Sequence, residues 1–133
     1  METEAAVRAW IEAWDEAWRA KDATPLAAVY ADDAVFRSHP FREPERPLDY
    51  ARGAFDEEGE ELELWWGDPL LSGDRAAVEY WAVLTENGEL VSLAGIATLH
   101  FGADGRVTEQ HDYWASTPGR TRPWPEWATT SAQ

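Results

Sequence analysis

One histidine and two carboxylates have the chemistry expected of a site that moves protons. His39 directly precedes Pro40 at the end of a predicted strand, and an imidazole with an ordinary pKa of about 6.5 both accepts and donates protons at neutral pH. Asp112 and Glu79 lie on later predicted strands. We expect His39 and Asp112 to face one another across a pocket, with Glu79 or Arg37 as a further partner. The alternative is structural: His39 only caps the strand before Pro40.

Cofactor and metal motifs are absent from the sequence. There is no cysteine, which removes disulfides and thiolate nucleophiles. No nucleophile elbow, phosphate loop, HExxH motif or dinucleotide fingerprint occurs. The acidic run 56–61 lacks the ligand spacing of a calcium loop, and we expect it to be a solvated helix end and loop. We therefore expect a cofactor-free reaction or none, and no metal.

Size and charge limit the remaining classes. A chain of 133 residues is long enough for one domain and too short for two. Its net charge of −15, with only 11 scattered Lys and Arg, argues against nucleic acid and anionic membranes as partners. The acidity either attracts a cationic ligand or, more simply, keeps the surface solvated. Without a secretory signal or an apolar run of about 20 residues, we expect a soluble, cytoplasmic protein.

Three helices are predicted in the first half of the chain. The first spans Glu4 to Lys21, and its apolar residues recur at spacings of three and four: Val7, Trp10, Ile11, Trp14 and Trp18. A shorter second helix follows Thr24-Pro25 and carries Leu26, Val29 and Tyr30 towards Asp32-Asp33. The third runs from Leu48 to about Glu57 after Pro47, with Ala51 and Phe55 on its apolar face.

The rest of the chain reads as strands separated by turns. A short strand is expected over 34–38, followed by a proline-rich loop over 41–47. Further strands are expected over 62–71, 75–85, 90–101 and 106–115. Helices first and an antiparallel sheet afterwards predict an α+β domain in which the helices cover one face of the sheet.

The turn at Asn87-Gly88 decides which side chains of one strand face inward. On the strand 90–101, the odd-numbered residues from Leu93 to Phe101 are apolar and should face a cavity, whereas Ser92, Thr98 and His100 lie on the other face. A two-residue type I′ turn would pair Tyr80 with Gly95 and turn Glu79 outward. A three-residue loop with a glycine bulge would turn Glu79 and Trp81 inward, and this is the arrangement that we favour.

Four stretches resemble the nuclear transport factor 2-like superfamily, which includes SnoaL-like cyclases, ketosteroid isomerases, limonene epoxide hydrolases and scytalone dehydratases. They are the first-helix pattern ending in Lys21-Asp22-Ala23, the segment 30–36 (YADDAVF), the strand opening 73–79 (GDRAAVE), and the hairpin 99–107 (LHFGADGRV) running to Tyr113-Trp114. The resemblance implies a cone-shaped fold, with three N-terminal helices on a strongly curved, mostly antiparallel sheet, over residues 1–117. Residues 118–133 form a Pro- and Trp-containing tail, which is disordered unless Trp124 and Trp127 dock over the pocket mouth or on a partner.

The resemblance also suggests which residues form the site. It places Gln110, Asp112 and Trp114 inward on the last strand. The catalytic positions of ketosteroid isomerases correspond to His39, Trp14 and Ala97 here, so we do not expect steroid-isomerase chemistry. It further implies a homodimer formed through the exposed sheet face.

The leading hypothesis is a SnoaL-like enzyme that binds a small apolar organic molecule and performs acid/base chemistry without a cofactor, as an isomerase, cyclase, dehydratase or hydrolase. His39, Asp112 and Glu79 are the predicted catalytic residues. The predicted ligand-binding residues are Trp14, Tyr30, Arg37, Phe55, Trp81, Ala97, Gln110 and Trp114. The alternative is a non-catalytic domain of the same fold that binds a small ligand or assembles with another protein.

Overall fold

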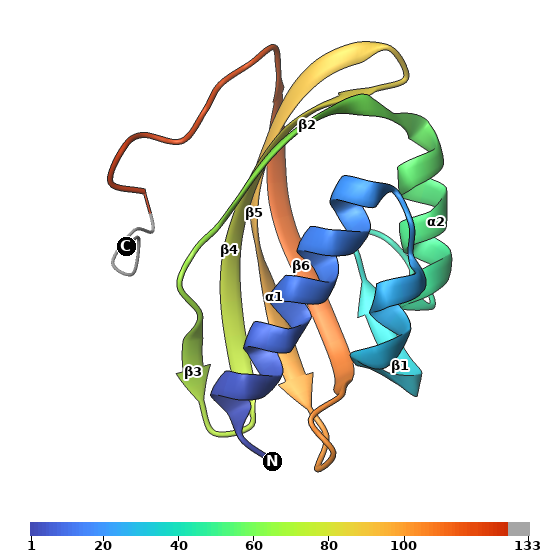
Figure 1. The fold of residues 1–133 in the computed structure, drawn as a ribbon, viewed down its shortest axis with the longest axis vertical. Helices are drawn as coiled ribbons and strands as arrows, with labels where there is room; N and C mark the ends of the chain where they lie inside the picture. The colour runs from blue at the N-terminus through green and yellow to red at the C-terminus, as the bar shows by residue number, and fades with distance from the viewer. Residues whose placement is uncertain (128–133) are drawn as a thin grey trace.

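The layered arrangement follows from one amphipathic helix packed against a curved sheet. A computed structural model describes residues 1–127 of the chain. Figure 1 shows helix α1 (Thr3–Ala20) lying across one face of the curved sheet, with helix α2 (Pro47–Glu57) beside it. Among the described residues, no helix has both the length and the apolar character needed to cross a membrane.

Six strands form the sheet in the order β1-β6-β5-β4-β2, and β3 pairs separately with β4. The strands are β1 (Tyr30–Arg37), β2 (Glu58–Trp66), β3 (Leu70–Ser72), β4 (Arg75–Glu86), β5 (Glu89–Phe101) and β6 (Val107–Pro118). The sheet is mixed, because β1 runs parallel to β6 while the other pairs are antiparallel. The chain therefore has the predicted α+β arrangement.

Helix α1 has the predicted apolar face. Val7, Trp10, Ala13, Trp14 and Ala17 are buried on it. The helix ends at Lys21, whose left-handed backbone (φ 56°) places its N–H against the carbonyls of Ala17 and Trp18. The helix thus presents three tryptophans, counting the partly buried Trp18, to the inner face of the sheet.

The second predicted helix is wrong in type and length, so the fold has two α-helices where we expected three. Residues Thr24–Ala28 form a short 3-10 helix, η1, held by i→i+3 bonds such as Leu26 N–H to Ala23 O (2.9 Å). The chain then enters β1 at Tyr30, because the Val29 carbonyl accepts a hydrogen bond from Val107 N–H (2.8 Å). Pairing with β6 overrides the local helical pattern.

The acidic run 56–61 begins as the helix end that we expected, but it continues as a strand and not as a loop. Helix α2 ends at Glu57 and β2 begins at once at Glu58. The expected strand 62–71 is divided in two, since β2 ends at Trp66 and β3 starts at Leu70. Both parts pair with β4, and the pairing of β2 draws residues 58–61, the later part of the acidic run, into the sheet.

The hairpin between β4 and β5 has the tighter of the two predicted turns. Asn87 and Gly88 both have positive φ (53° and 82°), as a type I′ turn requires. Tyr80 therefore pairs with Gly95. Our preference for the bulged loop was wrong: Tyr80 points inward, while Glu79 and Trp81 lie on the outer face.

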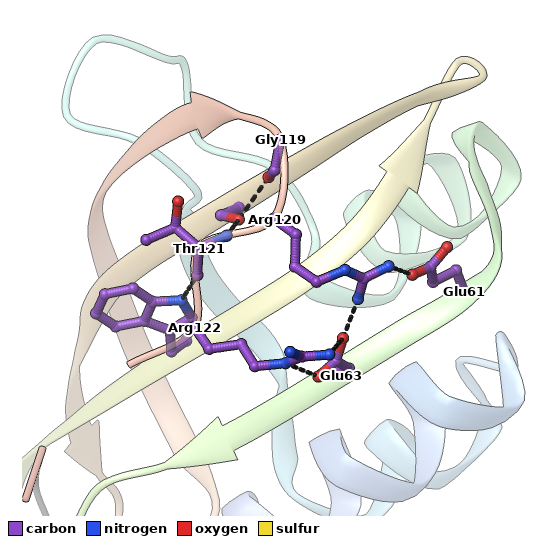
Figure 2. Close-up of polar contacts among 8 residues, drawn as sticks. Glu61, Glu63, Gly119, Arg120, Thr121 and Arg122 are labelled. Atoms are coloured by element: carbon purple, nitrogen blue, oxygen red, sulfur yellow. Dashed lines mark hydrogen bonds and ion pairs between the residues drawn. The ribbon is translucent and has the colours of Figure 1, made fainter. Parts of the chain in front are cut away.

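The segment 119–127, here called the strap, docks on the outer face of the sheet (Figure 2). Ser92 Oγ donates to Gly119 O and accepts from Thr121 N–H (both 2.7 Å). Arg120 pairs with Glu61 and Glu63, and Arg122 pairs with Glu63. The tail is therefore docked, but on the outer face of the chain's own sheet, and not over the pocket mouth, where we had expected it as one of two sites. Residues 128–133, which we expected to form the end of the same tail, lie outside the described residues.

Two tryptophans anchor the end of the strap. The rings of Trp124 and Trp127 both meet Trp81 edge to face, at centroid distances of 6.1 and 5.8 Å. Trp81 also donates its indole N–H to Thr121 O (2.8 Å). The strap leaves Val83 and Ser92 almost fully buried, although both lie on the outer face of the sheet.

Candidate functional site

A cavity of about 460 Å³ lies between α1, α2 and the inner face of the sheet. Aromatic rings from both helices and three strands form much of its wall: Trp10, Trp14, Trp18, Tyr50, Phe55, Trp66, Tyr80 and Trp114. The spacing of three and four residues along α1 directs its tryptophans inward. Side chains alternate between the two faces of a strand, and this alternation directs Tyr80 on β4 and Trp114 on β6 inward as well. The cavity is large enough for a small organic molecule.

Asp112 is the central polar group of the cavity wall. Its Oδ1 accepts a hydrogen bond from Gln110 Nε2 (2.9 Å), and its Oδ2 accepts one from the Tyr80 hydroxyl (3.1 Å). Burial raises the pKa of Asp112 from 3.8 to about 7, although the hydrogen bonds from Gln110 and Tyr80 favour the charged form. The carboxyl group remains reachable through the cavity, because the residue is only partly shielded from solvent.

A chain of hydrogen bonds behind the wall fixes the orientation of Gln110. Its Oε1 accepts from Trp10 Nε1 (3.1 Å) and from the Tyr30 hydroxyl. Tyr30 in turn accepts from Trp10 Nε1 (3.1 Å) and Trp14 Nε1 (2.8 Å). With its oxygen held by two donors, Gln110 must direct its amide NH₂ towards Asp112.

The two phenols on the cavity wall remain protonated near neutral pH. Burial raises the pKa of Tyr80 and of Tyr50, and the nearby Asp112 carboxylate acts in the same direction. Tyr80 donates to Asp112. The ring of Tyr50 packs edge to face on Phe36 (4.9 Å), but no hydrogen bond joins its hydroxyl to any described residue.

Most charged side chains along the cavity are acidic. Glu45, Asp49, Glu57, Glu58 and Glu86 line it together with Asp112, whereas Arg42 is the one basic residue among the described lining. Glu58 accepts from Trp18 Nε1 (2.8 Å) and Lys21 Nζ (2.9 Å). Arg42 donates to Ser38 Oγ (3.1 Å) and lies over the Trp114 ring at 5.3 Å from its centroid.

Several predicted site residues lie where we expected them. Trp14, Phe55, Gln110, Asp112 and Trp114 all line the cavity. Two others lie behind its wall. Tyr30 is buried and joins the hydrogen bonds that hold Gln110, and Ala97 is fully buried directly opposite Asp112 on β5.

The structure does not bring the expected His39–Asp112 pair together. His39 Nδ1 accepts a hydrogen bond from Phe41 N–H (3.4 Å), and its ring packs edge to face on Trp114 at 4.9 Å. Both Asp112 oxygens are engaged by Gln110 and Tyr80 instead. His39 is absent from the cavity wall, in agreement with the structural alternative in which it caps the end of β1.

Three further predicted residues lie away from the cavity. Glu79 is exposed on the outer face of the sheet, and Trp81 on the same face supports the strap. The type I′ turn is the reason, because it reverses the facing that we favoured for this strand. Arg37 donates to Arg42 O (2.7 Å) and stabilises the loop after β1.

Sequence reasoning missed Tyr80 and Tyr50. The Asn87-Gly88 dipeptide could have predicted that Tyr80 faces inward, because it is typical of the two-residue turn that pairs Tyr80 with Gly95. For Tyr50 no signal was available, because it lies beside the apolar stripe of α2 and turns inward only through the packing of that helix. Among residues 1–127, no group of three or more His, Asp or Glu side chains is arranged to hold a metal ion.

Solved structures similar to this chain share its fold. One is an LEH-like epoxide hydrolase of M. tuberculosis (TM-score 0.68, 23% identity, 86% of each chain covered). A second is a nuclear transport factor 2-like protein of unknown function from Burkholderia pseudomallei (0.67, 21%, 86% of this chain and 92% of that one). A third is the epoxide hydrolase/cyclase-like enzyme SalBIII of pyran ring formation in salinomycin (0.68, 13%, 86% and 96%).

Comparison with functionally curated proteins gives no match. The match to a family is nevertheless extensive. The family model of the SnoaL-like domain covers residues 7–110, which include both helices, five of the strands and the start of β6. The chain therefore belongs to the SnoaL-like domain family.

Proposed function

We propose that this protein is a small-molecule enzyme in which Asp112 transfers a proton to or from a ligand held in the aromatic cavity. The observation that carries the proposal is a carboxyl group on the cavity wall whose pKa burial raises to about 7. At neutral pH such a group is present in both protonation states, which is the condition for efficient general acid–base catalysis.

The neighbours of Asp112 suit that role. Tyr80 and Gln110 each donate one hydrogen bond to the carboxylate, and they stabilise the charge that Asp112 acquires after giving up its proton. The bonds from Trp10 and Tyr30 to Gln110 hold the amide ready, so little reorganisation is needed during proton transfer. The aromatic wall lowers the local dielectric and strengthens these interactions.

The reaction type that we propose is isomerisation, cyclisation, dehydration or hydrolysis without a cofactor. Two of the structurally similar proteins are named for epoxide chemistry, which makes epoxides the first class to examine. Opening an epoxide breaks one C–O bond while the oxygen of a water or of a ligand hydroxyl forms another. Protonated Asp112 would supply the proton that the departing oxygen takes up, and the proton lost by the attacking oxygen would restore it. The homodimer and the cytoplasmic location stay predictions.

A non-catalytic binding domain is the second candidate. The favouring observation is that the polar atoms around Asp112 already satisfy one another, from Trp14 through Tyr30 and Gln110 to Tyr80. Holding the fold together can be the sole role of a network of this kind. In that case Asp112 would position side chains and not react.

The test combines a titration with an assay. The pKa of Asp112, followed by NMR of its ¹³C-labelled carboxyl carbon, should lie near 7, and Tyr80→Phe should raise it further because a donor to the carboxylate is lost. Hydration of styrene oxide should fall by about 10²-fold or more in Asp112→Asn and remain unchanged in Glu79→Gln, a variant of the outer face. An Asp112 pKa near 4, or equal turnover in native protein and Asp112→Asn, would contradict the proposal.

A further inference from the structure

The tryptophans of the cavity wall have no N–H group left for a ligand. Trp10 and Trp14 donate to Gln110 and Tyr30, as described above. Trp18 donates to Glu58 (2.8 Å), Trp66 to Asp15 (3.0 Å) and Trp114 to Ser38 O (2.6 Å). These rings therefore offer a ligand only their π faces and C–H edges.

The groups that do remain are mainly acceptors. Each oxygen of Asp112 receives one hydrogen bond and can accept another. The hydroxyl of the half-buried Tyr50, which no hydrogen bond joins to a described residue, can both accept and donate there. A ligand with hydrogen-bond donors complements all of these oxygens, whereas a ligand that carries only acceptors can pair with Tyr50 but leaves the remaining positions of the Asp112 carboxylate unpaired.

The charges along the cavity also favour a ligand that donates hydrogen bonds, and in particular one that is positively charged. Six carboxylates and one arginine line it, and the chain as a whole carries a net charge of −15. A concave site with low-dielectric walls concentrates the field of such charges. The result is a negative potential inside the cavity, which repels anions and attracts cations.

The protein's own cations already lie over rings of the cavity wall. The Arg42 guanidinium lies over Trp114 at 5.3 Å, and Lys21 Nζ lies 6.0 Å from the centroid of Phe55. Positive charge is favoured over an aromatic face by the quadrupole of the ring. The other rings of the wall, such as Trp14 and Trp66, offer similar surfaces to a bound molecule.

We propose that the cavity binds an organic cation, namely a compact apolar or aromatic molecule that carries a protonated nitrogen. The inference rests on the proposed function only in placing the ligand in the same cavity. The apolar body of the ligand packs on the tryptophans. Its N–H groups donate to Asp112, Tyr50 or the carboxylates at the mouth.

Three probes of the same shape test the charge preference: 3-phenylpropylammonium, 3-phenylpropanol and 3-phenylpropanoate. Isothermal titration calorimetry at pH 7.5 and low salt should give the tightest binding for the ammonium, weaker binding for the alcohol and the weakest for the carboxylate. Raising the salt concentration should weaken binding of the ammonium and leave the alcohol unchanged. Equal affinities, tighter binding of the alcohol or carboxylate, or no binding of the ammonium would overturn the proposal.

A matched pair of charge changes separates the cavity from the overall acidity. Replacing Glu57 and Glu86, which line the cavity, by glutamine should weaken ammonium binding by about fivefold and leave alcohol binding unchanged. Glu79→Gln removes a charge from the outer face and should change neither. An equal loss in Glu79→Gln would show that net charge alone attracts the cation, contrary to the proposal. The pKa of Asp112, measured by NMR in the free protein, does not depend on which probe binds. A failure of the charge preference can therefore be distinguished from a failure of the proposed proton transfer.

Discussion

Asp112, whose carboxyl group is partly buried on the cavity wall, is the residue on which the proposed function depends. Its pKa is raised from 3.8 to about 7, and burial is the largest cause. No cationic side chain donates to it among the described residues, and two neutral donors offset only part of the cost of burying its charge. A residue that lowers stability in its charged form is typical of a functional site.

The first prediction concerns the pH dependence of stability. The unfolded chain releases the Asp112 proton near pH 3.8, whereas the folded protein keeps it until about pH 7. The folded state therefore binds more protons between these values, and the Asp112 contribution to the free energy of unfolding falls as the pH rises through this range. The loss is complete once the pH lies well above 7, and it is then on the order of 4 kcal/mol.

Asp112→Asn removes this titration while keeping the side-chain shape. The asparagine oxygen can accept from Gln110, and its NH₂ can donate to the Tyr80 hydroxyl. We expect Asp112→Asn to be more stable than the native protein by about 1–3 kcal/mol at pH 8 and similar to it at pH 4.5, as measured by urea unfolding. Asp33→Asn, at an exposed position, is the control. A native protein that is as stable as Asp112→Asn at pH 8 would contradict the raised pKa.

Strand parity decided which site residues could be predicted from the sequence. The inward facing of Gln110, Asp112 and Trp114 was correct. For Glu79 the same reasoning failed because it depended on a single turn, and the alternative turn reverses every side chain of β4. His39 was chosen for its chemistry, and neither its ring contact with Trp114 nor the bonding of Asp112 to Tyr80 can be read from residue types alone.

At the scale of elements, the approach of β5 to β6 depends on Gly95. A Cβ added there would lie 2.5 Å from both Trp114 Cβ and Tyr113 O. No rotation of a flexible side chain relieves contacts with a backbone oxygen and a Cβ. Gly95 therefore allows the strand that carries Trp114 to lie close beside its neighbour.

We expect Gly95→Ala to lower the free energy of unfolding by about 1–3 kcal/mol through overpacking. Gly53→Ala is the matched control, because a Cβ at this helical position meets nothing within 4 Å. In an α-helix, that change should stabilise the protein by about 0.5–1 kcal/mol. Urea unfolding of both variants measures the contrast, and a neutral Gly95→Ala would show that β5 and β6 can separate without cost.

The strap depends on one buried hydroxyl of β5. Ser92 is 2% exposed and bonds to both Gly119 and Thr121. Ser92→Ala leaves these backbone groups without their partner, at a cost of about 1–2 kcal/mol. We expect faster trypsin cleavage after Arg120 in this variant. Thr98→Ala, which removes an exposed hydroxyl from the same strand, should leave the cleavage rate unchanged.

Helix α1, helix α2 and the three long strands β4, β5 and β6 were predictable because each has a periodic apolar pattern or a clear turn. The segment 24–33 was not, since its helical pattern competes with pairing to a strand nearly 80 residues later in the chain. Its Tyr30 pairs with Val107 on β6. A long-range contact of this kind leaves no trace in local sequence periodicity.

At the scale of the whole molecule, the α+β arrangement and the family follow from the order of the elements and from extended sequence similarity. The chemistry of the cavity does not. Its acidic lining brings together the ends of α2 and β4 with residues of the loop after β1. Only the closed fold shows that these carboxylates and the Asp112 network share one cavity.

The outer face of the sheet limits how two copies of the chain can associate. The strap covers Trp81, Val83 and Ser92 on that face, and it bonds to Glu61 and Glu63 through two arginines. Homodimerisation through the exposed sheet face, which the family resemblance implies, must therefore use surface beside the strap or displace it.

We expect a chain truncated after Pro118 to self-associate at lower concentration than the full chain. Truncation exposes the apolar surface of Trp81 and Val83, and exposed patches of this kind favour association. Light scattering of both proteins across a concentration series measures the difference. Ligand binding in the cavity should persist in the truncated chain, because none of the residues 119–127 lines it. Identical masses at all concentrations would show that the strap does not control access to this face, and the dimer would then form elsewhere or not at all.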